Sequence, residues 1–282
     1  MADAEISNAD QAEYWSSAHK WVDYEDRLDA TLAPVLDRLL QEADVQPGQR
    51  VLDIGCGTGA STLQIADAVG ADGHVTGADI STLLLARAKE RGALADNVEF
   101  VLSDAQTYEF PPGSYDMALS RFGVMFFEDS PVAFANIGRA VKPGGRIMFM
   151  AWANKASNPW FDVPAQTAID HFGPVPPADP RAPGPLAFAD RDYVAGILES
   201  AGLRDISVCP FNIDLTPPGS ITDAANLSCR VGLAARILRL HDGTESDALK
   251  IETRVAEAFE KFDTNDGVRL PAVLNFCQAR VD

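Results

Sequence analysis

Nine consecutive residues, Val51 to Gly59, constrain the fold of this chain more than any other stretch of its sequence. They read Val-Leu-Asp-Ile-Gly-Cys-Gly-Thr-Gly, so an apolar run reaches Asp53 and passes at once into three glycines spaced two apart. A helix-like segment, Ala60 to Val69, follows directly. Glycine is favoured where the backbone turns sharply and where a ligand approaches main-chain atoms that a Cβ would block. A strand, a glycine turn and a helix start in this order indicate the ligand loop of a doubly wound α/β fold.

Two classes of ligand are compatible with this loop. The pattern Gly55-x-Gly57-x-x-Ala60 satisfies the dinucleotide fingerprint, in which a pyrophosphate lies at the N-terminus of the helix. Asp53 favours the other class, because a carboxylate two residues before the first glycine repels a pyrophosphate and suits a ligand with an ammonium group. The loop by itself leaves both classes open.

The two strands predicted next also end in acids. Residues 75–80 read as a short second strand, and Asp79 comes twenty residues after Gly59. At that spacing one carboxylate can accept hydrogen bonds from both hydroxyls of a ribose. Residues 97–105 read as a third strand that ends in Asp104.

A fourth and a fifth strand complete the series. Residues 115–122 read as the fourth, and the turn Pro143-Gly144-Gly145 leads into an apolar fifth strand over 147–152. A single acid at a strand end is more often an ordinary cap, and Ser81 and Asp129 are expected to be such caps. Five such sequence features, in this order over about a hundred residues, are hard to obtain by chance. They favour a ligand with an ammonium group.

The series resembles class I S-adenosylmethionine-dependent methyltransferases of the small-molecule type, the broad group that includes ubiquinone and menaquinone C-methyltransferases. The resemblance is strong over residues 49–152, suggestive over 10–35 and topological only beyond 153. It implies S-adenosylmethionine as cofactor and S-adenosylhomocysteine as product. It implies that Asp79 holds the ribose, that Ile80 packs on the adenine, and that Asp104 accepts from the adenine amino group. The full set of cofactor-binding residues that we expect is Asp53, Gly55, Cys56, Gly57, Thr58, Gly59, Asp79, Ile80, Asp104, Ala105, Ser120, Arg121, Tyr14 and Trp21.

Composition excludes several other classes. The net charge of −18 disfavours a nucleic-acid partner, because a protein that binds phosphates needs a basic surface. No apolar run approaches the ~20 residues of a membrane helix, and the polar, acidic N-terminus predicts no secretory signal. The four cysteines are widely scattered, without paired spacing for zinc or disulfides, so we expect a cytoplasmic protein.

The order of the segments predicts an α/β, Rossmann-like, doubly wound fold with a mostly parallel seven-stranded sheet, its last strand antiparallel, and a helical lid. Residues 10–42 read as helical, and Pro34 implies a break or a new helix start near Ala33. Helices over 221–240 and 246–262 are expected to form the lid or, alternatively, a homodimer surface; Leu249, Val255 and Phe259 are expected on the inner face of the second. The expected organisation is a helical flap over 1–48, the cofactor core over 49–152, an irregular proline-rich cover over 153–189, the end of the core over 190–218, the lid over 219–266 and the last strand over 267–282.

The resemblance implies in-line transfer of a methyl group to an oxygen, nitrogen, sulfur or carbon of a small molecule. No motif identifies a general base; the candidates are His19, Tyr14 and His171, each of which also reads as a surface or packing residue. Phe122, Phe126 and Trp152 are candidate substrate-binding residues or simply core. No metal is expected, because Ser120-Arg121-Phe122-Gly123 follows the fourth strand where metal-dependent catechol enzymes place clustered acids. Two alternatives stay open: a cofactor-binding protein or partner subunit without transfer activity, and a nicotinamide oxidoreductase.

Overall fold

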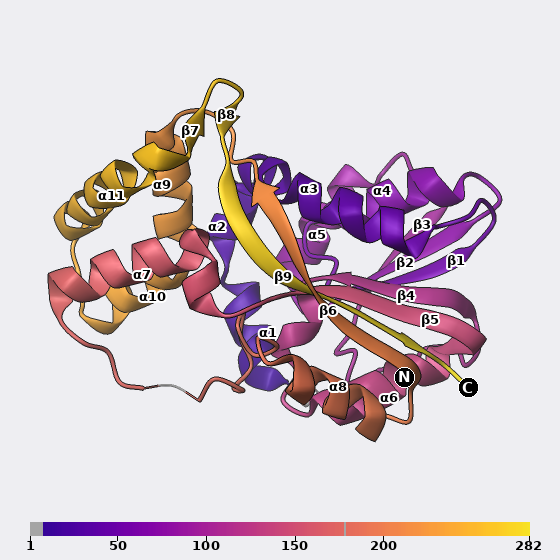
Figure 1. The fold of residues 1–282 in the computed structure, drawn as a ribbon. Coiled ribbons are helices and arrows are strands. Elements are labelled where there is room, and N and C mark those ends of the chain that lie inside the picture. The colour runs from indigo at the N-terminus through magenta and orange to yellow at the C-terminus, as the bar shows by residue number, and fades with distance from the viewer. Residues whose placement is uncertain (1–7, 178) are drawn as a thin grey trace.

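The computed structural model describes residues 8–177 and 179–282 and contains one large sheet covered by helices on both faces (Figure 1). Its seven strands are β1 (Arg50–Ile54), β2 (His74–Asp79), β3 (Val98–Leu102), β4 (Tyr115–Arg121), β5 (Val141–Trp152), β6 (Arg204–Leu215) and β9 (Leu270–Arg280). They lie in the order β3-β2-β1-β4-β5-β9-β6. Only β9 runs antiparallel to its neighbours β5 and β6 in this sheet. The predicted fold class and the antiparallel last strand are confirmed.

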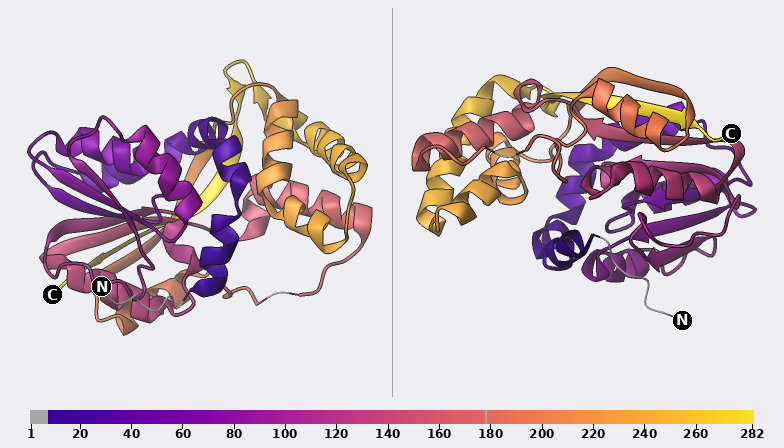
Figure 2. Two further views of the ribbon diagram at one scale, coloured as in Figure 1. Left: turned by 180° about the vertical axis from the view of Figure 1, so that it is seen from behind. Right: turned by 90° about the horizontal axis from the view of Figure 1, so that it is seen from below.

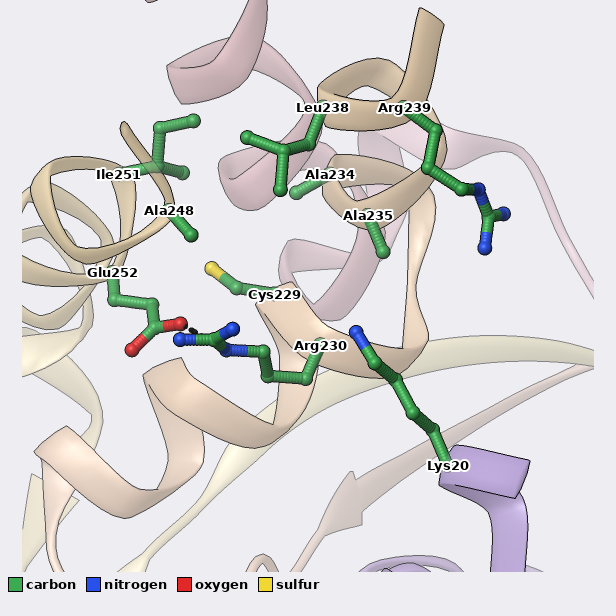
Figure 3. A pocket seen from close by; sticks show the side chains of 10 residues that line it. All are labelled: Lys20, Cys229, Arg230, Ala234, Ala235, Leu238, Arg239, Ala248, Ile251 and Glu252. Atoms are coloured by element: carbon green, nitrogen blue, oxygen red, sulfur yellow. Dashed lines mark ion pairs between the residues drawn. The ribbon is translucent and has the colours of Figure 1, made fainter. Parts of the chain in front are cut away.

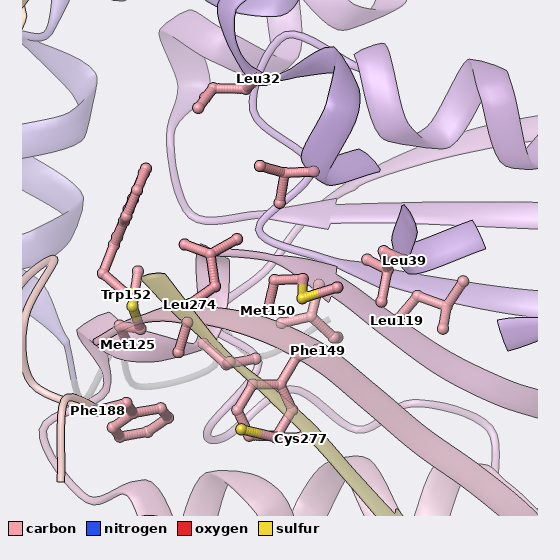
Figure 4. Packing of buried hydrophobic residues seen from close by; sticks show 14 of the residues in the cluster. Leu32, Leu39, Leu119, Met125, Phe149, Met150, Trp152, Phe188, Leu274 and Cys277 are labelled. Atoms are coloured by element: carbon pink, nitrogen blue, oxygen red, sulfur yellow. The ribbon is translucent and has the colours of Figure 1, made fainter. Parts of the chain in front are cut away.

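Helices on both faces shield the apolar strands from water. The sheet helices are α3 (Glu25–Ala43), α4 (Ala60–Val69), α5 (Thr82–Arg91), α6 (Ser130–Ala140) and α8 (Arg191–Ser200). Figure 1 shows α3 and α4 above the sheet and α6 and α8 below it. Side chains alternate between these layers, so Phe149 of β5 meets Phe134 of α6, while Leu39 of α3 and Leu119 lie on the opposite side of the sheet (Figure 4). The expected caps form: Ser81 and Asp129 accept from the backbone at the starts of α5 and α6.

The helix before the first strand differs from expectation at its proline. Helix α3 runs without interruption through Pro34, and the chain breaks earlier, between α1 (Ala9–Ser16), α2 (His19–Asp23) and α3. A proline inside a helix costs ~3 kcal/mol. Burial of a large apolar side chain is worth roughly 1.5–3 kcal/mol, and α3 buries five of them: Leu28, Leu32, Val35, Leu36 and Leu39. Their packing on the sheet outweighs the defect.

Four further helices pack against one another beyond the sheet, and we call them the helical unit (Figure 2). They are α7 (Pro159–Phe172), α9 (Ile221–Val231), α10 (Leu233–Leu240) and α11 (Glu245–Phe259). A small hairpin, β7 (Asp263–Thr264) and β8 (Gly267–Val268), joins the unit to β9. The N-terminal helices α1 and α2 lie between this unit and the sheet, and α2 contacts α3, α5 and α9. None of the helices in the described ranges has the length and apolar character that a membrane crossing requires.

Three local predictions in these segments are wrong. The segment 153–189 is not irregular throughout, because α7 forms over 159–172; Pro159 opens the helix, where a missing N–H costs nothing. The single helix expected over 221–240 is two helices that meet at Gly232, where a Cβ would lie 2.6 Å from the Ser228 carbonyl oxygen. On α11, Leu249 is 53% exposed. The inner face instead repeats at helical spacing through Ala248, Ile251, Val255 and Phe259.

Candidate functional site at the carboxyl edge of the sheet

The glycine loop leaves the end of β1 and opens into helix α4. Gly55 has φ +68°, and a Cβ there would lie 2.5 Å from Cα of Gly123, so the loop after β4 packs directly against it. Gly57 also has a positive φ of +57°, but nothing lies within 4 Å of the place its Cβ would take. The first glycine is therefore required by close packing, and the second leaves an open space beside the backbone that a ligand could enter.

Asp79 at the end of β2 holds the glycine loop in place. Its carboxylate accepts from the Gly57 amide at 2.8 Å through Oδ2 and from the Ser81 amide at 2.8 Å through Oδ1. Burial raises the pKa of Asp79 to about 6, against the opposing effect of these two hydrogen bonds. A carboxylate oxygen has two acceptor positions. Each oxygen of Asp79 thus retains one for a hydroxyl group of a ligand.

Asp53 and Arg121 lie on neighbouring strands and face the same side of the sheet. Asp53 pairs with Leu119 in the β1–β4 register, and Arg121 follows Leu119 by two residues, so both side chains project toward α3 and α4. Oδ2 of Asp53 accepts from the hydroxyls of Ser61 at 2.6 Å and Thr62 at 2.7 Å on α4. Nη2 of Arg121 lies 3.5 Å from Asp29 of α3.

Each member of this pair keeps one unsatisfied atom. Oδ1 of Asp53 and Nη1 of Arg121 are buried and have no hydrogen-bond partner among residues 8–177 and 179–282. Burial raises the pKa of Asp53 and lowers that of Arg121, and the charge of each partner opposes the shift in the other. A buried acceptor and a buried donor without partners are costly in a folded protein. A ligand that carries an ammonium and a carboxylate would satisfy both.

Asp104 after β3 contacts a residue that the sequence did not point to, Asn8. The Asn8 backbone N–H donates to Oδ2 of Asp104 at 3.0 Å, and its side-chain Nδ2 donates to Oδ1 at 2.8 Å. Oδ1 of Asn8 accepts from the Glu128 amide at 2.6 Å, which ties the start of α1 to the loop before α6. The Gln106 amide is a third donor to Asp104, at 3.0 Å on Oδ1. One acceptor position remains on Oδ2.

An aromatic cluster joins the N-terminal helices to the loop after β4. The Trp15 ring lies edge-on to Tyr14, Trp21 and Phe126, with centroids 5.1, 5.3 and 5.1 Å away. The Trp15 carbonyl also accepts from the Ser81 hydroxyl at 2.9 Å, one residue beyond Ile80. Helices α1 and α2 thus lie against the same edge of the sheet as Asp79 and Asp104. Trp15 belongs to this contact as much as Tyr14 and Trp21, the two residues that we expected there.

Phe122 and Trp152, two of the candidate substrate residues, form a stacked pair. Their ring centroids are 4.6 Å apart, with planes 6° from parallel, and Trp152 also meets Phe161 of α7 edge-on. Phe122 has φ +74°, an unfavourable conformation for a residue with a Cβ, directly after β4. Such strain gathers at functional sites. The pair marks the boundary between the end of β4 and the helical unit.

Several expected cofactor residues also have partners within the protein, and their role toward a cofactor stays a prediction. Ser120 donates to the Ile54 carbonyl at 2.7 Å and accepts from the Gly123 amide at 3.0 Å, so it fastens the two loops together. Thr58 accepts from Arg91 at 2.9 Å through its hydroxyl. The Ala105 carbonyl accepts from Asn136. Cys56 is buried, and burial raises the pKa of its thiol well above the ordinary value.

The three candidate bases lie in different places. Tyr14 is 46% exposed on α1, and His19 is exposed at the start of α2. His171 is on α7, where Nε2 lies 2.9 Å from Oδ1 of Asp247 on α11. This contact joins two helices of the helical unit. The structure therefore does not bring the three together, and the assignment of a base stays a prediction.

The part of the chain that carries the glycine loop matches a known family model. Residues 51–145 match the model described as a methyltransferase domain. The match begins at β1 and ends in the turn before the central part of β5, so the matched segment includes Asp53, Asp79, Asp104 and Arg121.

Curated relatives are similar over the same region. Phosphoethanolamine N-methyltransferase 1 of Arabidopsis thaliana is 32% identical over 121 residues, which are 43% of this chain and 24% of that protein. Demethylmenaquinone methyltransferase of Staphylococcus aureus is 37% identical over 111 residues, 39% of this chain and 46% of that protein. The chain thus spans less than half the length of these relatives.

Among solved structures, phosphoethanolamine N-methyltransferase 2 of Haemonchus contortus, in complex with phosphomonomethylethanolamine and S-adenosylhomocysteine, has a similar fold. The TM-score is 0.60 at 21% identity, over 98% of this chain and 59% of that one. At this identity the likeness concerns the fold alone.

Replacing Asn8 by alanine tests how the N-terminal helices are held. The change removes the side-chain donor to Asp104 and the acceptor for Glu128, and a hydrogen bond to a charged group is worth ~1.5–3 kcal/mol. Because local opening governs cleavage, we expect trypsin to cut after Lys20 about tenfold faster than in the unaltered protein. The matched control is Asn265→Ala in the exposed β7–β8 turn, which should leave this cleavage unchanged. Equal cleavage in Asn8→Ala and the unaltered protein would show that the Asn8 side chain does not hold α1 in place.

Proposed function

We propose that this protein is an S-adenosylmethionine-dependent methyltransferase that acts on a small molecule. The observation that carries the proposal is the placement of three separate polar groups along one edge of the sheet. The Asp53–Arg121 pair suits the amino-acid end of the cofactor, Asp79 its ribose, and Asp104 the amino group of its adenine. The spacing of the three groups along β1, β2 and β3 follows the order of the three parts in the cofactor.

The chain's own residues would bind and orient the cofactor. Oδ1 of Asp53 would accept from the ammonium and Nη1 of Arg121 would donate to the carboxylate, which pairs two buried atoms that are otherwise unsatisfied. The open space beside Gly57 would let part of the ligand lie against the main chain of the glycine loop. When bound, the cofactor supplies a methyl group on a sulfonium, which is reactive without further activation.

Positioning is the main contribution that the protein would make to the reaction. Correct alignment of two reactants can supply up to roughly 7–11 kcal/mol of a barrier. Trp152 and Phe122 form a rigid aromatic wall after β4, and the cluster of Trp15, Trp21 and Phe126 covers the edge from the N-terminal side. Together they would exclude water from the acceptor. The acceptor atom, whether oxygen, nitrogen, sulfur or carbon, decides whether a base is needed.

Calorimetry with S-adenosylhomocysteine and with NAD tests the cofactor. We expect the former to bind and the latter not to bind, because a pyrophosphate would meet the Asp53 and Asp79 carboxylates. No binding of S-adenosylhomocysteine at millimolar concentration would refute the proposal. Incubation with a metabolite extract and methyl-labelled cofactor then tests transfer: labelled small molecules support the enzyme, and binding without any labelled product would identify a cofactor-binding protein instead.

The pH dependence of cofactor binding tests the role of Asp79. An aspartate in an unfolded chain has a pKa of ~3.9, and burial raises that of Asp79 to about 6. Between these values the folded protein holds an extra proton, so the contribution of Asp79 to stability falls as pH rises through this window. Ribose hydroxyls need the ionised carboxylate of Asp79 as acceptor. The affinity for S-adenosylhomocysteine should therefore fall as the pH is lowered through this window. We expect about fivefold to tenfold weaker binding of S-adenosylhomocysteine at pH 5 than at pH 7.5.

The variant Asp79→Asn separates this titration from that of Asp53, whose pKa is also raised by burial. Its binding should be weak and nearly independent of pH over the same range. A pH dependence that persists in Asp79→Asn would assign the titration to Asp53 or to another group.

A cytoplasmic location stays a prediction, based on four cysteines that are all free in the structure. A homodimer through the helical unit also stays a prediction, which sedimentation analysis would test.

A further inference from the structure

A hollow lies between helix α2 and the helical unit, and none of its lining residues belongs to the glycine loop (Figure 3). Its cavity volume is about 70 Å³ and it opens to solvent, so it is smaller than a site that encloses a whole small molecule and would hold one part of a ligand. Its lining residues come from four helices and are Lys20, Cys229, Arg230, Ala234, Ala235, Leu238, Arg239, Ala248, Ile251 and Glu252.

The inner wall of the hollow is apolar. Ala234 of α10 and Ala248 and Ile251 of α11 are buried, and Leu238 lies beside them (Figure 3). The small side chains of the two alanines create the space between α10 and α11. An apolar wall of this kind binds a hydrocarbon or aromatic body through the hydrophobic effect.

The acidic groups near the hollow are already paired. Arg230 Nε lies 2.5 Å from Glu252 Oε1, and Arg230 Nη1 lies 2.8 Å from Glu245 Oε2. Asn226 donates to the other oxygen of Glu252 at 3.1 Å. The hydrogen bond to Glu245 raises the pKa of Arg230, which keeps it charged. Arg230 and its two acids thus form an ion-paired cluster at one side of the hollow, in which the contact between Arg230 Nε and Glu252 Oε1 lacks hydrogen-bond geometry.

The two other cations at the hollow have no such partner. Within the described part of the chain, neither Lys20 nor Arg239 has an acid within 4.0 Å or a side-chain hydrogen bond. Figure 3 shows the Lys20 side chain rising from α2 and the Arg239 side chain descending from α10 on the same side of the hollow. Burial, with the charges of Arg230 and Arg239, lowers the pKa of Lys20. Of the three cations that line the hollow, these two are the ones whose charge is not matched by an acid within 4.0 Å.

We propose that this hollow binds the methyl acceptor, and that the acceptor is an amphipathic molecule whose anionic group, a carboxylate or a phosphate, lies between Lys20 and Arg239. Its apolar body would lie against Leu238, Ala234 and Ile251. An anion there would lower the mutual repulsion of the cations and gain charge-assisted hydrogen bonds. The inference rests on the proposed methyltransferase function.

Helix α2 connects the hollow to the cofactor edge. Lys20 lines the hollow, and the next residue, Trp21, lies edge-on to Trp15, which in turn contacts Phe126 after β4. A molecule anchored at Lys20 could therefore extend along α2 toward the aromatic residues at the end of β4. Its anionic end would stay at the hollow and its reactive end would reach the cofactor.

Binding of simple probes tests the site without knowledge of the acceptor. Calorimetry in the presence of saturating S-adenosylhomocysteine would compare decanoate and decyl phosphate with decanol and decyltrimethylammonium, which share the same chain length. We expect at least one anion to bind tenfold or more tightly than both controls; the better of the two distinguishes a carboxylate from a phosphate acceptor. Equal binding of the anionic and cationic probes would overturn the proposal.

Two variants on different helices locate the anion. Lys20→Ala and Arg239→Glu should each weaken binding of the preferred anion about tenfold or more. Arg236→Glu makes the same charge change on the same helix, at an exposed residue outside the hollow, and should change binding less than twofold. Thermal unfolding of all three should match the unaltered protein, because these side chains are exposed. If Arg236→Glu and Arg239→Glu weaken binding of the anion equally, the anion responds to the general surface charge and the proposed site is refuted.

Labelling of a metabolite extract tests the acceptor role separately. The preferred anion should suppress methyl labelling, and Arg239→Glu should lower it tenfold or more while affinity for S-adenosylhomocysteine stays unchanged. Anion binding without any effect on labelling would refute the acceptor role. If the unaltered protein does not bind S-adenosylhomocysteine, the proposed function is refuted, whatever the result with the anionic probes.

Discussion

The variant Asp79→Ala is expected to bind S-adenosylhomocysteine well over tenfold more weakly than the unaltered protein. The change removes the proposed acceptor for two ribose hydroxyls, and a hydrogen bond to a charged group is worth ~1.5–3 kcal/mol. It also frees the Gly57 and Ser81 amides, which Asp79 holds at 2.8 Å, so the glycine loop loses its support from β2. Both effects act in the same direction. Calorimetry measures the change directly.

The matched control for this variant is Asp72→Ala, which removes an exposed acid in the turn before the same strand. Its affinity should stay within about twofold of the unaltered protein, because surface substitutions of this kind have small effects. Unchanged affinity in Asp79→Ala would show that the ribose lies elsewhere, and with it the order of the three polar groups along the sheet edge would be wrong.

The variant Arg121→Met is expected to lose affinity only for ligands that carry the amino-acid end of the cofactor. Nη1 of Arg121 has no partner within the described residues and would donate to the carboxylate, so its removal should weaken S-adenosylhomocysteine binding about tenfold to a hundredfold. Methylthioadenosine has the same adenosine but no amino-acid group. Its affinity should change less than twofold, whereas Asp79→Ala should weaken both ligands because both contain the ribose.

A comparison of the two ligands shows whether Arg121 contacts the ligand directly or only stabilises the fold around the site. Arg121 also contacts Asp29 of α3, which pairs with Arg91 at 2.8 Å, so its loss disturbs an ionic network that includes α5. A purely structural role would weaken both ligands equally and lower the thermal stability. Equal losses for S-adenosylhomocysteine and methylthioadenosine would therefore contradict the proposed contact.

The helical unit lies outside the part of the chain that matches a known family. Residues 51–145 match a family model described as a methyltransferase domain, and the strand-end acids of this segment occupy the expected edge. The helical unit lies beyond that match, so its role depends on what its own residues can bind. Arg239 of this unit and Lys20 of the adjacent α2 line the hollow and are the feature that predicts a ligand.

Much of the site could be predicted because its residues are close to their partners in sequence or fixed by strand order. The glycine loop, Asp79 and Asp104 each follow a strand, and parallel strands bring their carboxyl ends to one edge. The caps at Ser81 and Asp129 involve donors only three residues away. Local chemistry of this kind is visible in a single sequence.

The errors arose where packing between distant elements decides. Pro34 predicts a break, but α3 continues because its buried leucines pack on the sheet. The sequence predicts Leu249 on the inner face of α11, but Leu249 is exposed and its neighbour Ala248 is buried, because apolar character alone does not set the register of a short helix. Asn8 gives no signal in the sequence, since a lone asparagine is common in turns; its partners Asp104 and Glu128 are 96 and 120 residues away.

The sequence by itself determined the sheet, the glycine loop and the acids at its carboxyl edge, because the period of a strand and the spacing of turns are local properties of the chain. Only the tertiary structure decided that Asp53 and Arg121 share one face with an unsatisfied atom each, and that Lys20 and Arg239 line the same hollow. These charges lie 68 and 219 residues apart. Their interaction depends on distance in space, and no local pattern encodes it.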